Sequence, residues 1–119
     1  MKEAVIERAL IKRVKELGGE VRKVQWIGRS SAPDRLVMLP ETWKTVQLAA
    51  YGHHPSREDQ WLDRPAHTIW VEVKNPDTIK TFPADARERA QHREHERMRR
   101  LGQCVEVIGT LEQIESLLS

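Results

Sequence analysis

The chain has 119 residues, of which 39% are hydrophobic and 32% charged, which suits one soluble domain with a modest core and excludes a disordered chain. No apolar run approaches the ~20 residues that span a bilayer, no apolar signal region follows the N-terminus, and the single cysteine, Cys104, excludes an internal disulfide. These features predict a cytoplasmic protein, and the net charge of +2 is by itself too small to establish nucleic-acid binding.

The N-terminal part predicts a helix followed by two strands. Apolar residues recur at three- and four-residue spacing over residues 3–17, and Gly18-Gly19 end that helix. Alternating residues predict a short strand over Val21–Trp26. The Gly, Ser and Pro residues of Gly28–Pro33 predict a loop, and the apolar run Arg35–Leu39 predicts a second, compact strand.

Residues 41–66 predict an irregular excursion from the domain. Thr42–Tyr51 is compatible with a strand or a poorly formed helix, and Gly52–Pro65 has the composition of a loop. The aromatic residues of this segment favour packing over base stacking.

The second half begins with the clearest strand of the chain, Thr68–Lys74, in which Ile69, Val71 and Val73 face one way and the intervening residues the other. Asn75-Pro76-Asp77 ends it. A long helix is predicted over Pro83–Leu101, with Pro83 in its first turn and with Met98 and Leu101 facing the sheet.

A strand over Cys104–Ile108 and a helix over Leu111–Leu118, with Thr110 as N-cap, complete the chain. The order α-β-β-β-α-β-α predicts one α/β domain, a mixed sheet flanked by helices. The strand-helix-strand step from 68 to 108 favours a right-handed crossover and a parallel pair.

Glu72 and Lys74 carry the first sign of chemistry. They lie two apart in a strand, so their side chains leave the same face, roughly 7 Å apart along the chain. Glu72 offers a carboxylate and Val73 its carbonyl, which are the hard ligands that Mg²⁺ prefers, while Lys74 could orient or deprotonate an attacking water or offset charge on a phosphate. An acidic-x-Lys triplet is nevertheless expected about once by chance in this composition, and an exposed pair on an edge strand stays an alternative.

Asp34 adds a second carboxylate. It follows Pro33 at the start of a strand, and its parity with Leu36 and Met38 predicts a side chain along the face of the sheet. Beside Glu72 it would complete a metal pocket; the alternative is a turn-forming Asp after Pro.

Two helices add polar candidates. Gln91, His95 and Met98 share one stripe of the long helix, so Gln91 is expected near the buried side, where a water or phosphate oxygen, or a strand terminus, would partner its amide. Glu3 or Glu7 could aim at the site from the first helix. The long helix also carries many charged residues, and for most of them we expect a solvent-exposed face with salt bridges between neighbours. These charged residues are Arg87, Glu88, Arg89, Arg93, Glu94, Glu96, Arg97, Arg99 and Arg100.

Taken together, these residues resemble the stand-alone VRR-NUC domain nucleases of phage and bacteria, a branch of the PD-(D/E)xK superfamily. The matching segments are IERALIKRVKELGG, Lys23, APDRLVML, IWVEVK, Gln91 and LGQCVEVI, which occur in order over most of residues 1–119 outside 41–66. The resemblance implies a restriction-endonuclease-like fold, Mg²⁺- or Mn²⁺-dependent hydrolysis of DNA phosphodiesters, and a bacterial or phage-infected host cytoplasm.

The resemblance also implies roles for individual residues. Asp34 and Glu72 would bind the metal with the main-chain carbonyl of Val73, and Glu7 is a further candidate ligand. Lys74 would act at the water, and Gln91 would be a supporting amide. The compact phage members resemble Holliday junction resolvases and are thought to be homodimers, so branched DNA and a second copy are the expected partners. We expect DNA contacts from Lys23, Arg29, Arg35 and Arg87.

Two departures from the family pattern bear on substrate geometry. Ala32 stands where a Gly often precedes the PD pair, and 37 residues separate Asp34 from Glu72, more than the short hairpin of compact members. Alternatives are a restriction-like or end-processing nuclease and a catalytically silent fold that binds DNA or protein. A zinc site at His53, His54 and His67 is poorly supported, because no cysteine pair or regular spacing accompanies them.

Overall fold

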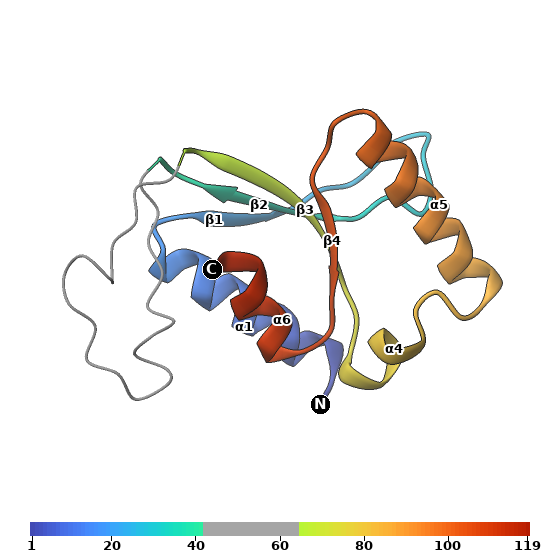
Figure 1. Ribbon diagram of the computed structural model, residues 1–119, viewed down its shortest axis with the longest axis horizontal. Coiled ribbons are helices and arrows are strands. Elements are labelled where there is room, and N and C mark those ends of the chain that lie inside the picture. The colour runs from blue at the N-terminus through green and yellow to red at the C-terminus, as the bar shows by residue number, and fades with distance from the viewer. Residues whose placement is uncertain (42–64) are drawn as a thin grey trace.

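A computed structural model describes residues 1–41 and 65–119 of the protein (Figure 1). Predictions for Thr42–Tyr51, and for most of the excursion, lie outside the described residues. The described elements, in chain order, are α1 (Glu3–Glu16), β1 (Glu20–Lys23), β2 (Arg35–Leu39), β3 (His67–Val73), α4 (Pro76–Thr81), α5 (Ala86–Arg100), β4 (Val105–Ile108) and α6 (Leu111–Leu118).

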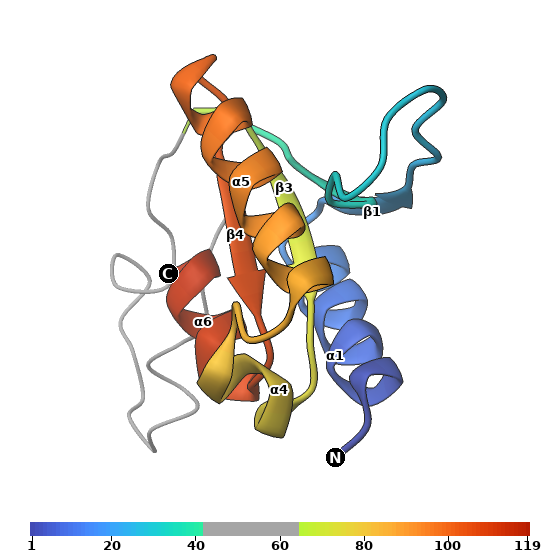
Figure 2. The same cartoon turned by 90° about the vertical axis from the view of Figure 1, so that its right-hand side faces the viewer.

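The four strands form one mixed sheet in the order β1-β2-β3-β4. β2 pairs antiparallel with both β1 and β3, and β3 pairs parallel with β4. The predicted parallel pair is therefore confirmed, and the chain between its two strands passes over the sheet as α4 and α5 (Figure 2). This crossover brings α5 above the strand that carries Glu72.

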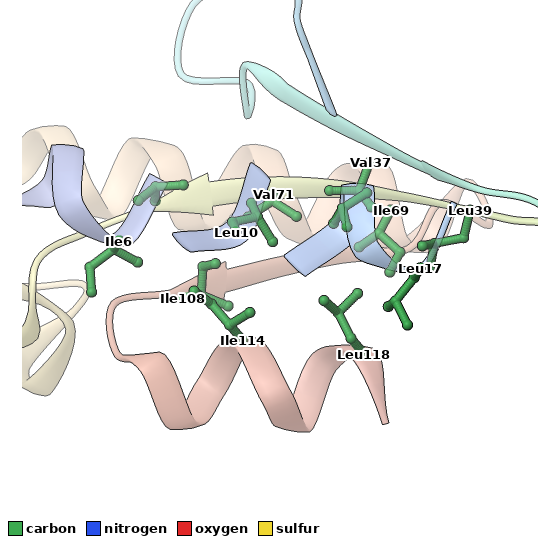
Figure 3. Packing of buried hydrophobic residues seen from close by; sticks show 12 residues of the cluster. Ile6, Leu10, Leu17, Val37, Leu39, Ile69, Val71, Ile108, Ile114 and Leu118 are labelled. Carbon is green, nitrogen blue, oxygen red and sulfur yellow. The ribbon is translucent and has the colours of Figure 1, made fainter. Parts of the chain in front are cut away.

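Helices cover both faces of the sheet, and the main core lies under α1 and α6 (Figure 3). Ile6, Leu10 and Val14 recur every four residues on α1 and are fully buried, as the helical spacing predicts. They meet the inward-facing residues of β2 and β3, of which Val37 and Val71 are also fully buried. Each such side chain contributes about 1.5–3 kcal/mol, so this layer holds the sheet rigid beneath the candidate site on the opposite face.

Helix α4 was not predicted from the sequence, because Asn75-Pro76-Asp77 has the residues of a chain break. In the structure the same residues start a helix. The Asn75 side chain accepts hydrogen bonds from the main-chain N–H groups of Asp77 and Thr78, and Pro76 occupies the first turn, where its missing N–H costs nothing. Asn75 thus both ends β3 and caps the next helix.

The predicted helix over Pro83–Leu101 is shorter at both ends. Asp85 caps α5 by accepting from the N–H of Glu88, so Pro83 precedes the helix instead of lying in its first turn. Met98 is buried as expected, but the prediction that Leu101 faces the sheet is wrong, since Leu101 is 74% exposed. The helix ends at Arg100, Leu101 is its C-cap, and the chain turns at Gly102, whose φ of +86° suits glycine.

The first strand also stops earlier than the predicted Val21–Trp26. After Lys23 the Val24 N–H still bonds to the main-chain oxygen of Asp34 at 2.8 Å, and the Trp26 indole donates to the main-chain oxygen of Pro33 at 2.8 Å. The Trp26 ring packs against Trp70 with centroids 5.0 Å apart. Trp26, in the segment between β1 and β2, therefore lies against β3. No helix in the described part of the chain is long and apolar enough to cross a membrane.

Candidate active site

The register of β2 against β3 relates the positions of Asp34 and Glu72. Arg35 pairs with Val71 and Leu36 with Trp70, so the same register set one residue further places Asp34 opposite Glu72. The main-chain N–H groups of Trp70 and Lys74 bond to main-chain oxygens on the β4 side. Glu72 lies between these two residues with the same parity, so its main-chain groups also point toward β4 and not toward β2. Asp34 and Glu72 therefore occupy a non-hydrogen-bonded position of the β2–β3 pair. Opposite Cα atoms at such positions lie about 4.5 Å apart, with their side chains close on one face.

Two carboxylates at such a position repel each other unless a cation lies between them. The Asp34 carboxylate receives one counter-charge, from the Arg35 guanidinium at 3.1 Å, and its side chain is 48% exposed. Glu72 is more enclosed, with 13% of its side chain exposed. The pair therefore offers hard oxygen ligands at a point that solvent reaches from the Asp34 side.

The main chain of Val73 adds a third oxygen at the same place. The alternation along β3 directs the Val73 carbonyl toward β2, where the continued register sets it opposite Pro33. Proline has no N–H to donate. In this part of the described sheet, the Val73 carbonyl therefore has no N–H of β2 opposite it to accept from.

Lys74 lies just beyond the end of β3 and is buried, with 8% of its side chain exposed. Its ammonium donates to Oε1 of Gln91 at 2.8 Å and lies 3.6 Å from Oε2 of Glu88. The ring of Phe82 covers it at 5.2 Å from the centroid. Three contacts from the α4–α5 side thus fix the ammonium. Because an ammonium has three N–H donors, one stays available when the other two point at Gln91 and Glu88.

Gln91 is buried on α5, as its position on the helical stripe predicts. Its observed partner, however, is the Lys74 side chain, which was neither of the partners considered from the sequence. The amide oxygen of Gln91 supports the site by holding Lys74.

Glu88 was assigned to the solvated face of the long helix, and that assignment is wrong. Its carboxylate is buried, accepts from the N–H of Ala84 at 2.9 Å through Oε1, and faces Lys74 through Oε2. A Glu three residues after an N-cap Asp is typical of a helix start, so the sequence explains the cap but not the second partner.

Glu7 approaches the site through an intermediary. Its Oε1 accepts from Nε and Nη2 of Arg35 at 2.9 and 2.7 Å, and the same guanidinium contacts Asp34. Glu3, the other candidate on α1, is exposed. The structure thus arranges Glu7, Arg35 and Asp34 in a row, in which Arg35 orients the Asp34 carboxylate.

The basic residues predicted to contact DNA are placed differently from one another. Lys23 and Arg29 line a surface pocket of about 620 Å³ that also includes Asp34 and Trp26. Arg29 is ion-paired with Glu94 of α5 at 3.0 Å, which ties the β1–β2 segment to that helix. Arg87 is exposed at the start of α5. Arg35 turns inward, so the structure gives it a role inside the protein and not on the surface.

A second pocket, of about 590 Å³, lies across the same segment. It is lined by Ser30 and Ser31, by the arginines of α5 at positions 93, 97 and 100, and by the acidic Glu94 and Glu96. Arg99, in contrast, donates to the main-chain oxygen of Val105 at 3.0 and 2.7 Å and holds α5 to β4. The arginines of α5 are therefore divided between packing and an open surface that also carries Glu94 and Glu96.

Comparison with known proteins relates this arrangement to one domain type. No model of a known protein family matches the chain, and no curated protein sequence matches it. The chain is similar to a solved structure described as "VRR_NUC domain", with 31% sequence identity, a TM-score of 0.64, and coverage of 99% of this chain and 95% of the other.

The chain belongs to the VRR-NUC family. The fold expected from the sequence, a mixed sheet flanked by helices in a nuclease-type domain, is confirmed. The observed order of elements differs from the expected order only by the added helix α4 among the described residues.

The donor set of this VRR-NUC chain fits a divalent cation of the Mg²⁺ type. Residues 1–41 and 65–119 hold no group of three or more His, Cys, Asp or Glu side chains in a metal-binding arrangement. The expected set is smaller, two carboxylates and one main-chain carbonyl, and oxygen-only coordination completed by waters is what Mg²⁺ favours. The continued β2–β3 register sets the Asp34 and Glu72 carboxylates on one face of the sheet, where such a cation would bind.

Sequence reasoning missed one further residue at the VRR-NUC site, His95. It was placed on the stripe of Gln91 without a role, yet its Nε2 lies 3.3 Å from Oε1 of Glu72 and its ring is fully buried. The helical spacing that carried Gln91 inward was the available indication, because His95 follows Gln91 by four residues.

Proposed function

We propose that this protein is a divalent-metal-dependent DNA endonuclease, which hydrolyses phosphodiester bonds with Mg²⁺ or Mn²⁺. The observation that carries the proposal is the β2–β3 register, which continued by one residue sets Asp34 opposite Glu72, together with a buried and fixed Lys74. Membership of the VRR-NUC family supports a nuclease-type chemistry. Asp34, Glu72 and the carbonyl of Val73 would hold the cation, which supplies Lewis-acid stabilisation of phosphate charge.

The side chains of the protein have separate tasks in this proposal. Asp34 and Glu72 provide negative charge that offsets a bound cation and fix where the phosphate approaches. Lys74, held by Gln91 and Glu88, directs its remaining N–H at the phosphate oxygen or the attacking water, where charge develops. Because three contacts hold the ammonium before substrate arrives, little reorganisation is needed during the reaction.

The path of the DNA is proposed along the two pockets that flank the β1–β2 segment. Lys23 and Arg29 line the pocket that includes Asp34, and Arg93, Arg97 and Arg100 line the neighbouring one. Arginine forks suit phosphate oxygens. A backbone laid across this surface reaches Asp34 from its exposed side.

Cleavage assays with Asp34→Asn and Glu72→Gln test the chemistry. Each substitution keeps the side-chain volume and removes one charge, so we expect loss of cleavage with Mg²⁺ and Mn²⁺ and retention of folding. Asp77→Asn is the matched control, because Asp77 is 94% exposed on α4 and is expected to leave the rate unchanged. Cutting at the wild-type rate by either site variant would overturn the assignment.

The proposed substrate is branched DNA, cut by a homodimer with one site for each strand, as the resemblance to junction-resolving members suggests. A panel of four-way junctions, flaps, linear duplex and single strands tests the shape preference. Equal or faster cutting of linear duplex contradicts the junction proposal and favours an end-processing or restriction-like nuclease. Analytical ultracentrifugation tests the dimer, and a monomer at micromolar concentration contradicts it.

A catalytically silent domain that only binds DNA or protein is the second candidate. The intact set of Asp34, Glu72 and Lys74 argues against it, since a binding module has no need for all three. Wild-type protein that binds the DNA panel but cuts none of it with Mg²⁺ or Mn²⁺ would establish this second candidate.

A further inference from the structure

His95 is a polar residue in a place where an apolar one would be expected. It lies on α5 one turn after Gln91, and none of its surface is exposed. Met98 continues the same stripe toward β4 as an apolar contact. A buried polar ring costs free energy unless hydrogen bonds satisfy it, so the partners of the imidazole explain why it is there.

The two ring nitrogens of His95 have different surroundings. Nε2 lies 3.3 Å from Oε1 of Glu72, whereas Nδ1 is buried and has no hydrogen-bond partner among the described residues. A buried N–H without an acceptor costs about 1–3 kcal/mol. This cost favours the tautomer with the ring proton on Nε2, where the Glu72 carboxylate accepts it, and with an unprotonated Nδ1.

Aromatic packing fixes the plane of this ring. Phe82 stacks on His95 with centroids 6.0 Å apart and planes at 28°, and the same phenyl ring covers the Lys74 ammonium. The imidazole thus has little freedom to turn away from Glu72. One side chain of the α4–α5 segment holds the neighbours of both Glu72 and Lys74 in place.

We propose that His95 is a positioning residue for the metal ligand Glu72. Its Nε2–H holds Oε1 of Glu72 and so directs the other carboxylate oxygen toward Asp34 and the cation. Outer groups that orient a metal ligand in this way typically change metal affinity 10- to 100-fold when they are removed. The inference rests on the proposed function, because it requires that Glu72 binds the metal.

Mn²⁺ affinity of paired variants, measured by calorimetry and by electron paramagnetic resonance, tests the proposal without reference to cleavage. His95→Gln can retain an N–H donor near Nε2, and we expect its dissociation constant to stay within about threefold of wild type. His95→Phe keeps an aromatic ring without a donor and is expected to bind Mn²⁺ about 10- to 100-fold more weakly. If His95→Phe does not fold, His95→Leu is the donor-free variant to measure in its place.

Met98→Leu is the matched control on the same helix face and is expected to bind Mn²⁺ as wild type does. A purely packing role for His95 predicts the reverse order, with His95→Phe or His95→Leu normal and His95→Gln destabilised, and that result overturns the proposal. Nitrogen NMR of the wild-type imidazole gives a test without any variant of His95. A proton on Nε2, with a resonance that shifts in Glu72→Gln, supports the contact, and a proton on Nδ1 contradicts it.

The same experiments separate failure of this inference from failure of the proposed function. If wild type binds Mn²⁺ in a way that depends on Glu72 and the donor-free variants bind equally well, only the positioning role is wrong. If wild type shows no Mn²⁺ binding that Glu72→Gln abolishes, both the metal site and the role of His95 are wrong.

Discussion

Nζ of Lys74 lies 3.6 Å from Oε2 of Glu88, and both side chains are more than nine-tenths buried. The two residues are fourteen apart in the chain and come together only because α5 crosses over the end of β3. Buried charges of opposite sign depend strongly on each other, since removal of one leaves the other uncompensated in a poorly solvated place.

Lys74→Met and Glu88→Gln are each expected to lower the free energy of unfolding by roughly 3 kcal/mol. Glutamine keeps the acceptor for the N–H of Ala84, so its effect reports the lost charge and not the lost cap. The double variant should be less destabilised than the sum of the two by 1 kcal/mol or more, about the scale of coupling between contacting residues. Urea denaturation measures all three, and strictly additive effects would show that the two charges do not interact.

A divalent cation should stabilise the folded protein. If Mn²⁺ binds at Asp34 and Glu72, a concentration of about 100 times its dissociation constant adds ~2.7 kcal/mol to the free energy of unfolding. Thermal denaturation should therefore occur several degrees higher with Mn²⁺ than with a chelator. Glu72→Gln should lose this gain, whereas Asp77→Asn should keep it. An equal increase in thermal stability of Glu72→Gln with Mn²⁺ would show that the cation binds elsewhere.

Glu7 is expected to act through Arg35. Glu7→Gln should reduce cleavage by about 10- to 100-fold, the range for a group that orients a ligand, because Arg35 still contacts Asp34 in its absence. Asp34→Asn, which removes a proposed ligand, should have a much larger effect. Steady-state cleavage rates of the two variants make the comparison. Equal losses would indicate that Glu7 is itself a ligand.

Cys104 offers a test of the packing around β4. Burial raises the pKa of its thiol above the ordinary value of 9.0, Glu106 adds to the rise, and Arg99 opposes it. The thiol should therefore react with iodoacetamide at pH 8 more slowly in the folded protein than in urea. Because the unfolded chain loses this proton first, the contribution of Cys104 to stability falls as the pH rises past the unfolded pKa. Cys104→Ser should remove that part of the pH dependence, and equal reactivity in both states would contradict it.

Gly109 allows α4 to approach the end of β4. A Cβ atom added there would lie 2.5 Å from Cβ of Ile79 and 2.8 Å from the main-chain oxygen of Asn75. Gly109→Ala should destabilise the protein by about 1–3 kcal/mol, as overpacked positions do, and should displace α4 and the Phe82 that follows it. Urea denaturation measures the first effect, and a stability equal to wild type would show that α4 moves freely.

Much of the fold follows from local patterns. The period-two run around Ile69 and Val71 and the apolar run Arg35–Leu39 predict the two strands that carry Glu72 and Asp34. Helical spacing predicts the buried stripes of α1 and α5. The start of α4 was missed because Asn-Pro-Asp is as suitable for a turn as for a helix cap; in the structure Asn75 caps the helix, and α4 packs closely against Gly109.

The sequence by itself determined which strands and which helix face would carry the polar residues, because periodicity is a property of neighbouring positions. It could not determine which residues meet across the site. Lys74 with Glu88 and Glu72 with His95 are contacts between a strand and a helix that crosses it, and their pairing depends on how far along the strand that helix packs. Helical periodicity determines on which side of its helix a residue lies. Only tertiary packing determines which residue of a neighbouring strand it meets.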